Sequence, residues 1–178
     1  VSEPSASLGV LCHERGDYRR AESLCREALA LWRARGAGTD ADTVALLNNL
    51  GQVVQDQRRY PEAEALAREG LDIDQRALGP DDENVGTDLN NLGNLLAKQG
   101  RYAESETLLR RAVAVLRARH SPWLPVAQGN LGEVLTRTGR AAEAAPLLDE
   151  ALQAACRDFG EENQDVAKIR VKYGECLL

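Results

Sequence analysis

The side chains of this sequence that could perform catalysis do not form an active-site pattern. Cys12, His13 and Glu14 place a thiol, an imidazole and a carboxylate at three consecutive positions. Neighbours in a helix point about 100° apart, so these groups cannot form a catalytic triad by themselves. The second histidine, His120, has no nucleophile near it in sequence. No GxSxG, HExxH, P-loop or GxGxxG motif occurs. We therefore predict that the chain is not an enzyme.

Metal and cofactor binding are also poorly supported. Zinc sites need cysteines and histidines at close, regular spacing. The chain has two histidines and four cysteines, none of them in a CxxC pair: Cys12, Cys25, Cys156 and Cys176. The acidic pairs Asp81-Asp82 and Glu161-Glu162 fall between expected helices, where carboxylates cap helix N-termini and offset the helix dipole. We expect no metal site and no cofactor.

The elements that carry these residues repeat along the chain. A Leu-Gly or Tyr-Gly pair recurs, with its glycines at Gly9, Gly51, Gly93, Gly132 and Gly174, separated by 42, 42, 39 and 42 residues. A tyrosine stands nine residues after each of the first three glycines. Small residues stand twelve and nineteen residues after each of the first four glycines. Small residues at fixed offsets indicate helices that approach closely at the same point of each repeat.

Each repeat is predicted to contain two helices. A short turn, often with glycine in a left-handed C-cap, separates them, and Asp or Ser with Pro precedes the next repeat. The third connector, 117–123, is three residues short, so we expect it to perturb the superhelix there. We expect first helices over 3–15, 42–57, 83–99, 122–138 and 163–177, and second helices over 18–35, 60–78, 102–119 and 141–158.

Composition agrees with an all-α fold and limits the class of partner. Ala and Leu supply 52 of the 178 residues and aromatic residues only 4%, which favours closely packed helices. No run of 18 apolar residues occurs, so we expect no membrane span. The net charge of −6, from 28 acidic and 22 basic residues, argues against a nucleic-acid partner.

Cysteine and arginine usage suggest where the protein works. Unpaired cysteines in a helical chain favour reduced thiols and a cytoplasmic location, with Cys12 and Cys25 buried as small apolar residues. Arginine supplies 19 of the 22 basic residues, which indicates a GC-rich, bacterial coding sequence. The sequence does not begin with Met, so we expect it to be part of a longer protein.

The repeat resembles a known family. Leu-Gly, followed by Tyr and then by two small residues, resembles the tetratricopeptide repeat. The 42-residue period and the segments Leu89-Asn90-Asn91-Leu92-Gly93 and 77–85 are similar to the kinesin light chain type. The resemblance implies an all-α, right-handed superhelical solenoid of antiparallel helix pairs. We expect one array over 1–178, with units of about 1–40, 41–82, 83–121 and 122–162 and a closing helix over 163–178.

A polar row runs along the expected first helices. With Gly51 at 0° and about 100° per residue, Leu47, Leu50 and Val54 share its side of the helix, and polar residues lie opposite. In tetratricopeptide arrays the first helices line the concave surface, and in the kinesin light chain family groove asparagines contact a cargo peptide. The resemblance therefore implies a peptide-binding groove formed by Asn49, Gln52, Asp56, Asn91, Asn94, Lys98, Asn130, Glu133 and Arg137, with Ser7, Val10 and Glu14 at the same positions of the first repeat.

Other interpretations of these residues stay open. Asn49, Asn91 and Asn130 could instead bond to a neighbouring helix, and that structural role is favoured for Asn48 and Asn90. Tyr18, Tyr60 and Tyr102 are expected to pack at the start of the second helices. A carboxylate clamp, which needs Lys or Arg at set positions, is not expected, because those positions hold Ala45, Thr87 and Val126.

The predicted function is a scaffold that binds an extended segment of a protein or peptide partner. One alternative is self-association through the ends of the array, since the sequence ends in the apolar run Cys176-Leu177-Leu178. Another is a regulatory arm of a larger multidomain protein.

Overall fold

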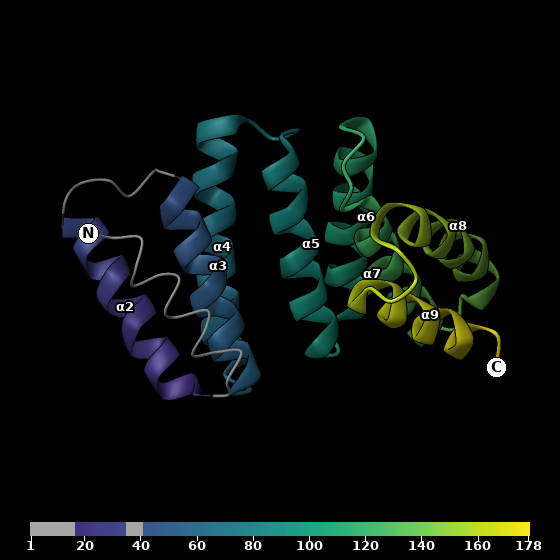
Figure 1. The fold of residues 1–178 in the computed structure, drawn as a ribbon, viewed down its shortest axis with the longest axis horizontal. Coiled ribbons are helices and arrows are strands. Elements are labelled where there is room, and N and C mark those ends of the chain that lie inside the picture. Colours follow the sequence, from purple (N-terminus) through teal and green to yellow (C-terminus); the bar gives the residue numbers. More distant parts are fainter. Residues whose placement is uncertain (1–16, 35–40) are drawn as a thin grey trace. The chain divides into compact units, whose positions relative to one another are not determined.

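The computed structural model describes residues 17–34 and 41–178, which form eight helices and no β-strand (Figure 1). Eight of the nine expected helices are confirmed, with ends within two residues of the prediction. The ninth, over 3–15, lies outside the described residues. The helices are α2 (Tyr18–Ala34), α3 (Ala41–Asp56), α4 (Tyr60–Leu78), α5 (Glu83–Lys98), α6 (Tyr102–Ala118), α7 (Leu124–Arg137), α8 (Ala141–Phe159) and α9 (Gln164–Cys176).

The chain forms two compact units, Val1–Pro80 and Asp81–Leu178. In the described part of the first unit, α3 packs against both α2 and α4. In the second unit each helix from α5 to α9 packs against the next one, and α7 also packs against α5 and α9. The first helices α5, α7 and α9 are therefore neighbours, which brings their side chains to a common surface.

The turns inside the repeats use left-handed backbone, as the glycines predict. Gly100 and Gly139 have φ of 76° and 77°. Arg58 occupies the same position in the α3–α4 turn with φ of 61°. A left-handed conformation is unfavourable for a residue with a Cβ, so Arg58 is held there by the helices on either side.

The helix starts agree in part with the sequence prediction. Asp82 caps α5, because its carboxylate accepts a hydrogen bond of 2.9 Å from the backbone N–H of Asn84. The helix expected from about residue 122 begins at Leu124, because Ser121 Oγ accepts from the Trp123 N–H and a turn precedes Leu124. The Ser121 hydroxyl also donates to Glu83, 2.6 Å away, and so ties the short third connector to α5.

Each unit has a core of aliphatic side chains. Leu47, Leu50 and Val54 of α3 are buried in the first unit, where Cys25 is also buried with a free thiol, as predicted. Cys12 lies outside the described residues. In the second unit the largest fully buried side chains are Leu89, Leu92, Leu96, Leu109, Leu116, Leu135 and Leu148, with Gln128, Val85 and Val134. Tyr102 packs against this core, which confirms its packing role.

The distance between the two helices of a repeat, measured at the repeated glycine, differs from one repeat to the next. A Cβ on Gly132 would lie 2.5 Å from Leu148 Cγ, and one on Gly93 would lie 2.7 Å from Leu109 Cγ. At Gly51 the nearest atoms are 3.9 Å away, an ordinary contact distance. The sequence explains this difference: sixteen residues after Gly51 stands Ala67, whereas Leu109 and Leu148 stand at that offset in the later repeats.

Ion pairs connect successive second helices within each unit. Arg26 and Arg33 of α2 pair with Glu62 and Glu69 of α4, each at 2.5 Å. The same arrangement recurs between α6 and α8, where Arg110 pairs with Glu143 at 2.5 Å and Arg117 pairs with Glu150 at 3.2 Å. Exposed pairs contribute about 0.2–1 kcal/mol each. In both units the two pairs are seven residues apart along each helix, so they agree with a single register between the two second helices.

One carboxylate in this system is shielded from solvent. Burial raises the pKa of Glu22, but hydrogen bonds from Gln57 and Arg59 and the positive charge of Arg26 outweigh burial, so its pKa lies below the usual value. The Arg59 guanidinium, in the turn before α4, lies 2.8 Å from the Glu22 carboxylate. This pair therefore links the α3–α4 turn to α2.

None of the described helices combines the length and the apolar character needed to cross a lipid bilayer.

The glycine contacts predict opposite effects of the same substitution at equivalent positions. Gly132→Ala will lower the free energy of unfolding by about 1–3 kcal/mol, because its Cβ collides with Leu148. Gly174→Ala will be neutral or stabilising by up to about 1 kcal/mol, because no atom lies within 4 Å of its Cβ and alanine favours the helix. Urea denaturation followed by circular dichroism measures both, and equal effects of the two substitutions would contradict the close approach.

The Glu22 carboxylate predicts a pH-dependent contribution to stability. A carboxyl whose folded pKa is lowered stabilises the fold above its unfolded pKa, and this contribution disappears as the pH falls through the folded pKa. Glu22→Gln will cost about 1–2 kcal/mol at pH 7, and this cost will decrease as the pH falls below the unfolded pKa of about 4.3. Urea titrations of both proteins at each pH test this. The control is Glu69→Gln, which removes an exposed pair; a gap that stays constant with pH would rule out the Glu22 contribution.

Candidate functional site

The predicted polar row lies on the first helices, with exposure that differs from residue to residue. On α3, Asn49 is half-buried, and Gln52 and Asp56 are exposed. The Gln52 amide donates to the Asp56 carboxylate at 3.1 Å. These three residues belong to the first unit.

In the second unit the row continues on α5 and α7. Asn91 and Lys98 are exposed and Asn94 is half-buried on α5. On α7 the exposure rises along the helix, from buried Asn130 through half-buried Glu133 to exposed Arg137. The predicted residues of the first repeat, Ser7, Val10 and Glu14, lie outside the described residues.

Asn130 belongs to a hydrogen-bonded chain that joins three first helices. Its side-chain amide donates to Asn90 Oδ1 on α5 at 2.8 Å, and its Oδ1 accepts from Lys172 Nζ on α9 at 2.5 Å. Lys172 Nζ also lies 3.1 Å from the Glu133 carboxylate. Asn130 is 7% exposed, and the bond to a neighbouring helix that was considered for it is present. The structural role predicted for Asn90 is confirmed.

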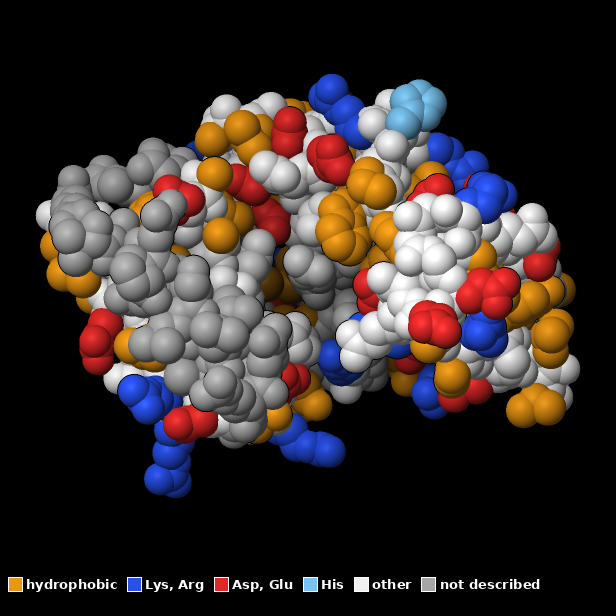
Figure 2. Space-filling view, viewed as in Figure 1, with side chains coloured by type: hydrophobic (Ala, Val, Ile, Leu, Met, Phe, Trp, Pro, Cys, Tyr) orange, Lys and Arg blue, Asp and Glu red, His pale blue; other side chains and the backbone are white. Residues whose placement is uncertain are grey.

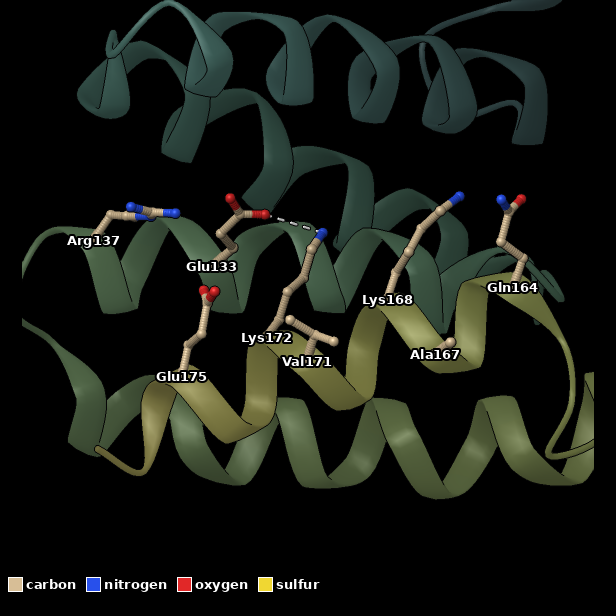
Figure 3. Close-up of a pocket in the computed structure, with 8 residues that line it drawn as sticks. All are labelled: Glu133, Arg137, Gln164, Ala167, Lys168, Val171, Lys172 and Glu175. Carbon is tan, nitrogen blue, oxygen red and sulfur yellow. Dashed lines mark ion pairs between the residues drawn. The ribbon is translucent and has the colours of Figure 1, made fainter.

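A pocket lies beside this chain, between α7 and α9 (Figure 3). Its volume is about 430 Å³. Ala167 and Val171 supply apolar surface, and the other lining side chains are charged or amide groups. In Figure 3, Glu133 and Lys172 point toward each other in the middle of the row of side chains. The lining residues are Glu133, Arg137, Gln164, Ala167, Lys168, Val171, Lys172 and Glu175.

Only two of the pocket residues, Glu133 and Arg137, were predicted from the sequence; the other six lie on α9. The signal for two more was present, because the repeat of 42 residues that relates Gly132 to Gly174 also relates Asn130 to Lys172 and Glu133 to Glu175. Extending the polar row by one more repeat would have found them.

The charges around the pocket are partly satisfied by the protein itself. Lys172 is engaged by Asn130 and Glu133, and Lys168 pairs with Asp165 on its own helix at 2.9 Å. Arg137, Gln164 and Glu175 make no side-chain hydrogen bond or ion pair with any other described residue. A guanidinium, an amide and a carboxylate therefore remain for a ligand, and they can both donate and accept hydrogen bonds.

The pocket residues include no hydroxyl, thiol or imidazole side chain. Across the part of the chain that the structure describes, no cluster of three His, Cys, Asp or Glu residues could hold a metal ion. His120 lies exposed after α6 with φ of 53°, and Cys12, His13 and Glu14 lie outside the described residues.

Family models match most of the sequence. One model of the tetratricopeptide repeat matches residues 4–76 and again 42–118, and a second model of this repeat matches residues 90–158. No curated protein matches the sequence.

Solved structures with the same fold include kinesin light chain-like proteins. A putative kinesin light chain with nearly identical TPR-like repeats from Podosopora anserina has 16% identity and a TM-score of 0.78, over 98% of this chain and 84% of that one. BtubC (BKLC) from P. vanneervenii has 23% identity and a TM-score of 0.81, over 92% and 66%. These matches confirm the predicted all-α helical-repeat fold and its kinesin light chain-like type.

A Rap protein complexed with competence and sporulation factor is also similar in fold. It has 15% identity and a TM-score of 0.82, over 98% of this chain and 51% of that one. The present chain thus spans about half the length of that Rap protein. At such identities the likeness concerns the fold.

The hydrogen-bonded chain predicts that two lysines of α9 differ in their contribution to stability. Lys172→Met removes the donor to both Asn130 and Glu133 and will lower the free energy of unfolding by about 1–2 kcal/mol. Lys168→Met removes only an exposed pair on its own helix and will change it by about 0.5 kcal/mol or less. Denaturant unfolding of the two variants measures the difference, and equal losses would contradict the structural role of Lys172.

Proposed function

Because this chain belongs to the tetratricopeptide repeat family, we propose that it is a non-catalytic scaffold that binds an extended segment of a partner protein. The proposed binding surface is the one lined by the first helices. The observation that carries the proposal is the pocket between α7 and α9, with polar groups around it that the protein leaves without partners. The family is generally a non-catalytic scaffold for protein–protein interaction.

The pocket has the properties that a peptide side chain requires. Its volume of about 430 Å³ lies within the range of small-ligand sites, about 300–1,000 Å³. Ala167 and Val171 can contact an apolar side chain of the peptide. Arg137 and Glu175 can bond to the peptide backbone or to polar side chains next to it. The bonds of Lys172 to α7 hold the two walls together before a ligand arrives, which lowers the entropic cost of binding.

The remaining residues of the polar row are proposed to extend the contact. Asn91 is exposed on α5, and an asparagine amide can both donate to and accept from a peptide group. We assign the same role to Asn94 and Lys98, and to Asn49, Gln52 and Asp56 in the first unit. Asn130 is buried and bonded to Asn90 and Lys172, so we propose that it takes part in the contact by holding Lys172 in place.

The proposal treats residues 1–178 as one array of four helix pairs and a closing helix. The overlapping family-model matches, which together run from residue 4 to residue 158, support this. The similar Rap protein is known in complex with competence and sporulation factor, which agrees with a binding role for the fold.

The proposal predicts that binding depends on the side chains around the pocket. A peptide selected from a random phage-displayed library will bind the wild type, and Arg137→Ala and Glu175→Ala will each weaken it about tenfold. Both residues are exposed and make no bond to another described side chain, so the fold will persist. Isothermal titration calorimetry gives the affinities, and NMR amide shifts will locate the peptide on α7 and α9.

Arg157→Ala is the matched control, because Arg157 is an exposed arginine on α8 outside the pocket. It is expected to leave the affinity unchanged. Peptide binding that is insensitive to Arg137→Ala and Glu175→Ala, or amide shifts confined to α6 and α8, would show that the first-helix surface is not the binding site.

A further inference from the structure

An exposed aromatic side chain lies where two connectors between repeats meet. Trp123, the residue before α7, is 47% exposed. Its ring packs against that of Phe159, the last residue of α8, with the ring centroids 6.1 Å apart and the planes tilted by 40°. Phe159 in turn packs on buried residues of α8 and α9, among them Ala155 and Val166. Phe159 therefore anchors the Trp123 ring at the surface of the second unit.

The turn at Trp123 does not need an aromatic residue. The side chain two residues before it accepts a hydrogen bond from the Trp123 backbone N–H, and the same contact forms in the corresponding turns at Asn84 and Asp165. Short polar side chains therefore stand at this position in the repeats of α5 and α9. Because the backbone contact is the same with all three residues, the indole of Trp123 is free to contact something else.

Described connectors flank Trp123 on both sides. On one side, Arg119 Nε donates to the Asp81 carbonyl at 2.7 Å, which packs the connector of Trp123 on the connector before α5. On the other side, Phe159 leads into the connector 160–163. By the same geometry a further repeat would pack on the connector 160–163, one repeat away from Trp123. The exposure of Trp123 is therefore a property of the described repeats.

Three carboxylates stand near the aromatic pair at the end of α8. Asp158, Glu161 and Glu162 lie within three residues of Phe159, are exposed, and make no hydrogen bond or ion pair with another described side chain. Figure 2 shows acidic side chains at the surface over α8 and α9, at the right of the view. Arg157 lies about 160° around α8 from Phe159 and so points to the other side of the helix. Aromatic surface and unpaired negative charge thus occur together at this edge of the second unit.

An arginine is the side chain that fits both features. Its guanidinium is attracted to the face of an indole, and it pairs with carboxylates through bidentate hydrogen bonds. We propose that Trp123 and Phe159, with the three carboxylates, bind an arginine in a basic segment of a partner protein. We call these five residues the connector site. The pocket between α7 and α9 shares none of them, so the connector site adds a second contact to the proposed scaffold.

Charge favours a basic partner protein over a second copy of this chain. The chain carries a net charge of −6, so two copies repel each other, whereas a basic segment is attracted. Four arginines of the second unit already pair with glutamates of this chain: Arg101, Arg110, Arg117 and Arg140. A copy could offer these arginines only by breaking its own ion pairs.

The test titrates a short basic peptide into the full 178-residue protein and follows the titration by NMR. The probe is a capped Gly-Arg-Gly-Arg-Gly peptide, and its matched control has glutamine in place of both arginines. The indole N–H signal of Trp123 and the amide signals of residues 158–163 are expected to shift with saturation, at a dissociation constant of about 1 mM or less. The indole signal of Trp32, the other tryptophan, is expected to stay in place.

Substitutions test the two parts of the connector site separately. Trp123→Asn is expected to weaken binding about fivefold or more, and Trp123→Phe, which keeps an aromatic ring, is expected to weaken it less. Asp158→Asn together with Glu161→Gln is expected to weaken binding about fivefold and to reduce its dependence on salt. The matched control removes two carboxylates elsewhere, Glu27→Gln together with Asp149→Asn, and is expected to leave the affinity nearly unchanged. Circular dichroism checks that each variant is folded.

Three results would overturn the proposal. The first is no saturable shift of the Trp123 indole signal up to about 10 mM peptide, or equal shifts with the glutamine peptide. The second is an equal loss of affinity in the two pairs of carboxylate substitutions, which would show only a general attraction to negative charge. The third is self-association of the protein alone, seen by analytical ultracentrifugation and abolished by Trp123→Asn, which would assign the connector site to a second copy.

Discussion

The close contact between a glycine of α5 or α7 and a leucine of the following second helix governs the packing of the second unit. At Gly93 and Gly132 a Cβ would lie 2.7 Å and 2.5 Å from a leucine Cγ, closer than non-bonded carbons can approach. The leucine side chain therefore occupies the space that a first-helix side chain would need. These contacts fix which side of α5 and α7 faces the second helices. They therefore also fix the direction in which the opposite, polar side of each helix points.

The first helices are joined to one another by a different kind of contact. Asn90, Asn130 and Lys172 form one hydrogen-bonded chain across α5, α7 and α9. Buried amides contribute to the fold only when they are bonded, and here the amide of Asn130 is bonded on both sides. Beside it, Gly129 lets Ile169 of α9 approach to 2.9 Å from the position of its Cβ. Two consecutive residues of α7 therefore hold α9 beside the pocket: Gly129 through an apolar contact and Asn130 through a hydrogen bond.

Much of the fold follows from spacing in the sequence, and the site follows from it less completely. The recurring glycines and small residues predicted eight described helices to within two residues, because the same pattern of helix, turn and helix is repeated along the chain. The later start of α7 follows a turn closed by the Leu124 N–H on the Ser121 carbonyl, in which the Ser121 hydroxyl also bonds to Glu83 and to the Trp123 N–H. A bond to a residue 38 positions earlier leaves no local signal.

The pocket was predicted only in part because its second wall comes from the last helix. The repeat spacing pointed to Lys172 and Glu175, which stand 42 residues after Asn130 and Glu133. The exposure of each residue in the polar row, however, depends on neighbouring side chains that the spacing does not specify. Asn91 and Asn130 occupy equivalent positions, yet one is exposed and the other is buried beneath Lys172. Gln128 shows the same limit in the core: it stands where α3 and α5 have Leu47 and Leu89, and its amide finds no partner among the described residues.

The two sides of α9 differ in the side chains that they expose. On the side of α7, Lys172 is held by Asn130 and Glu133, and the residues around it form a polar pocket. Elsewhere on α9, Val171 and Leu177 are exposed at positions that are buried in α5 and α7. Arg170 stands there in place of Leu89, so one charge interrupts the apolar surface. A charge among exposed apolar residues disfavours non-specific association of such a surface.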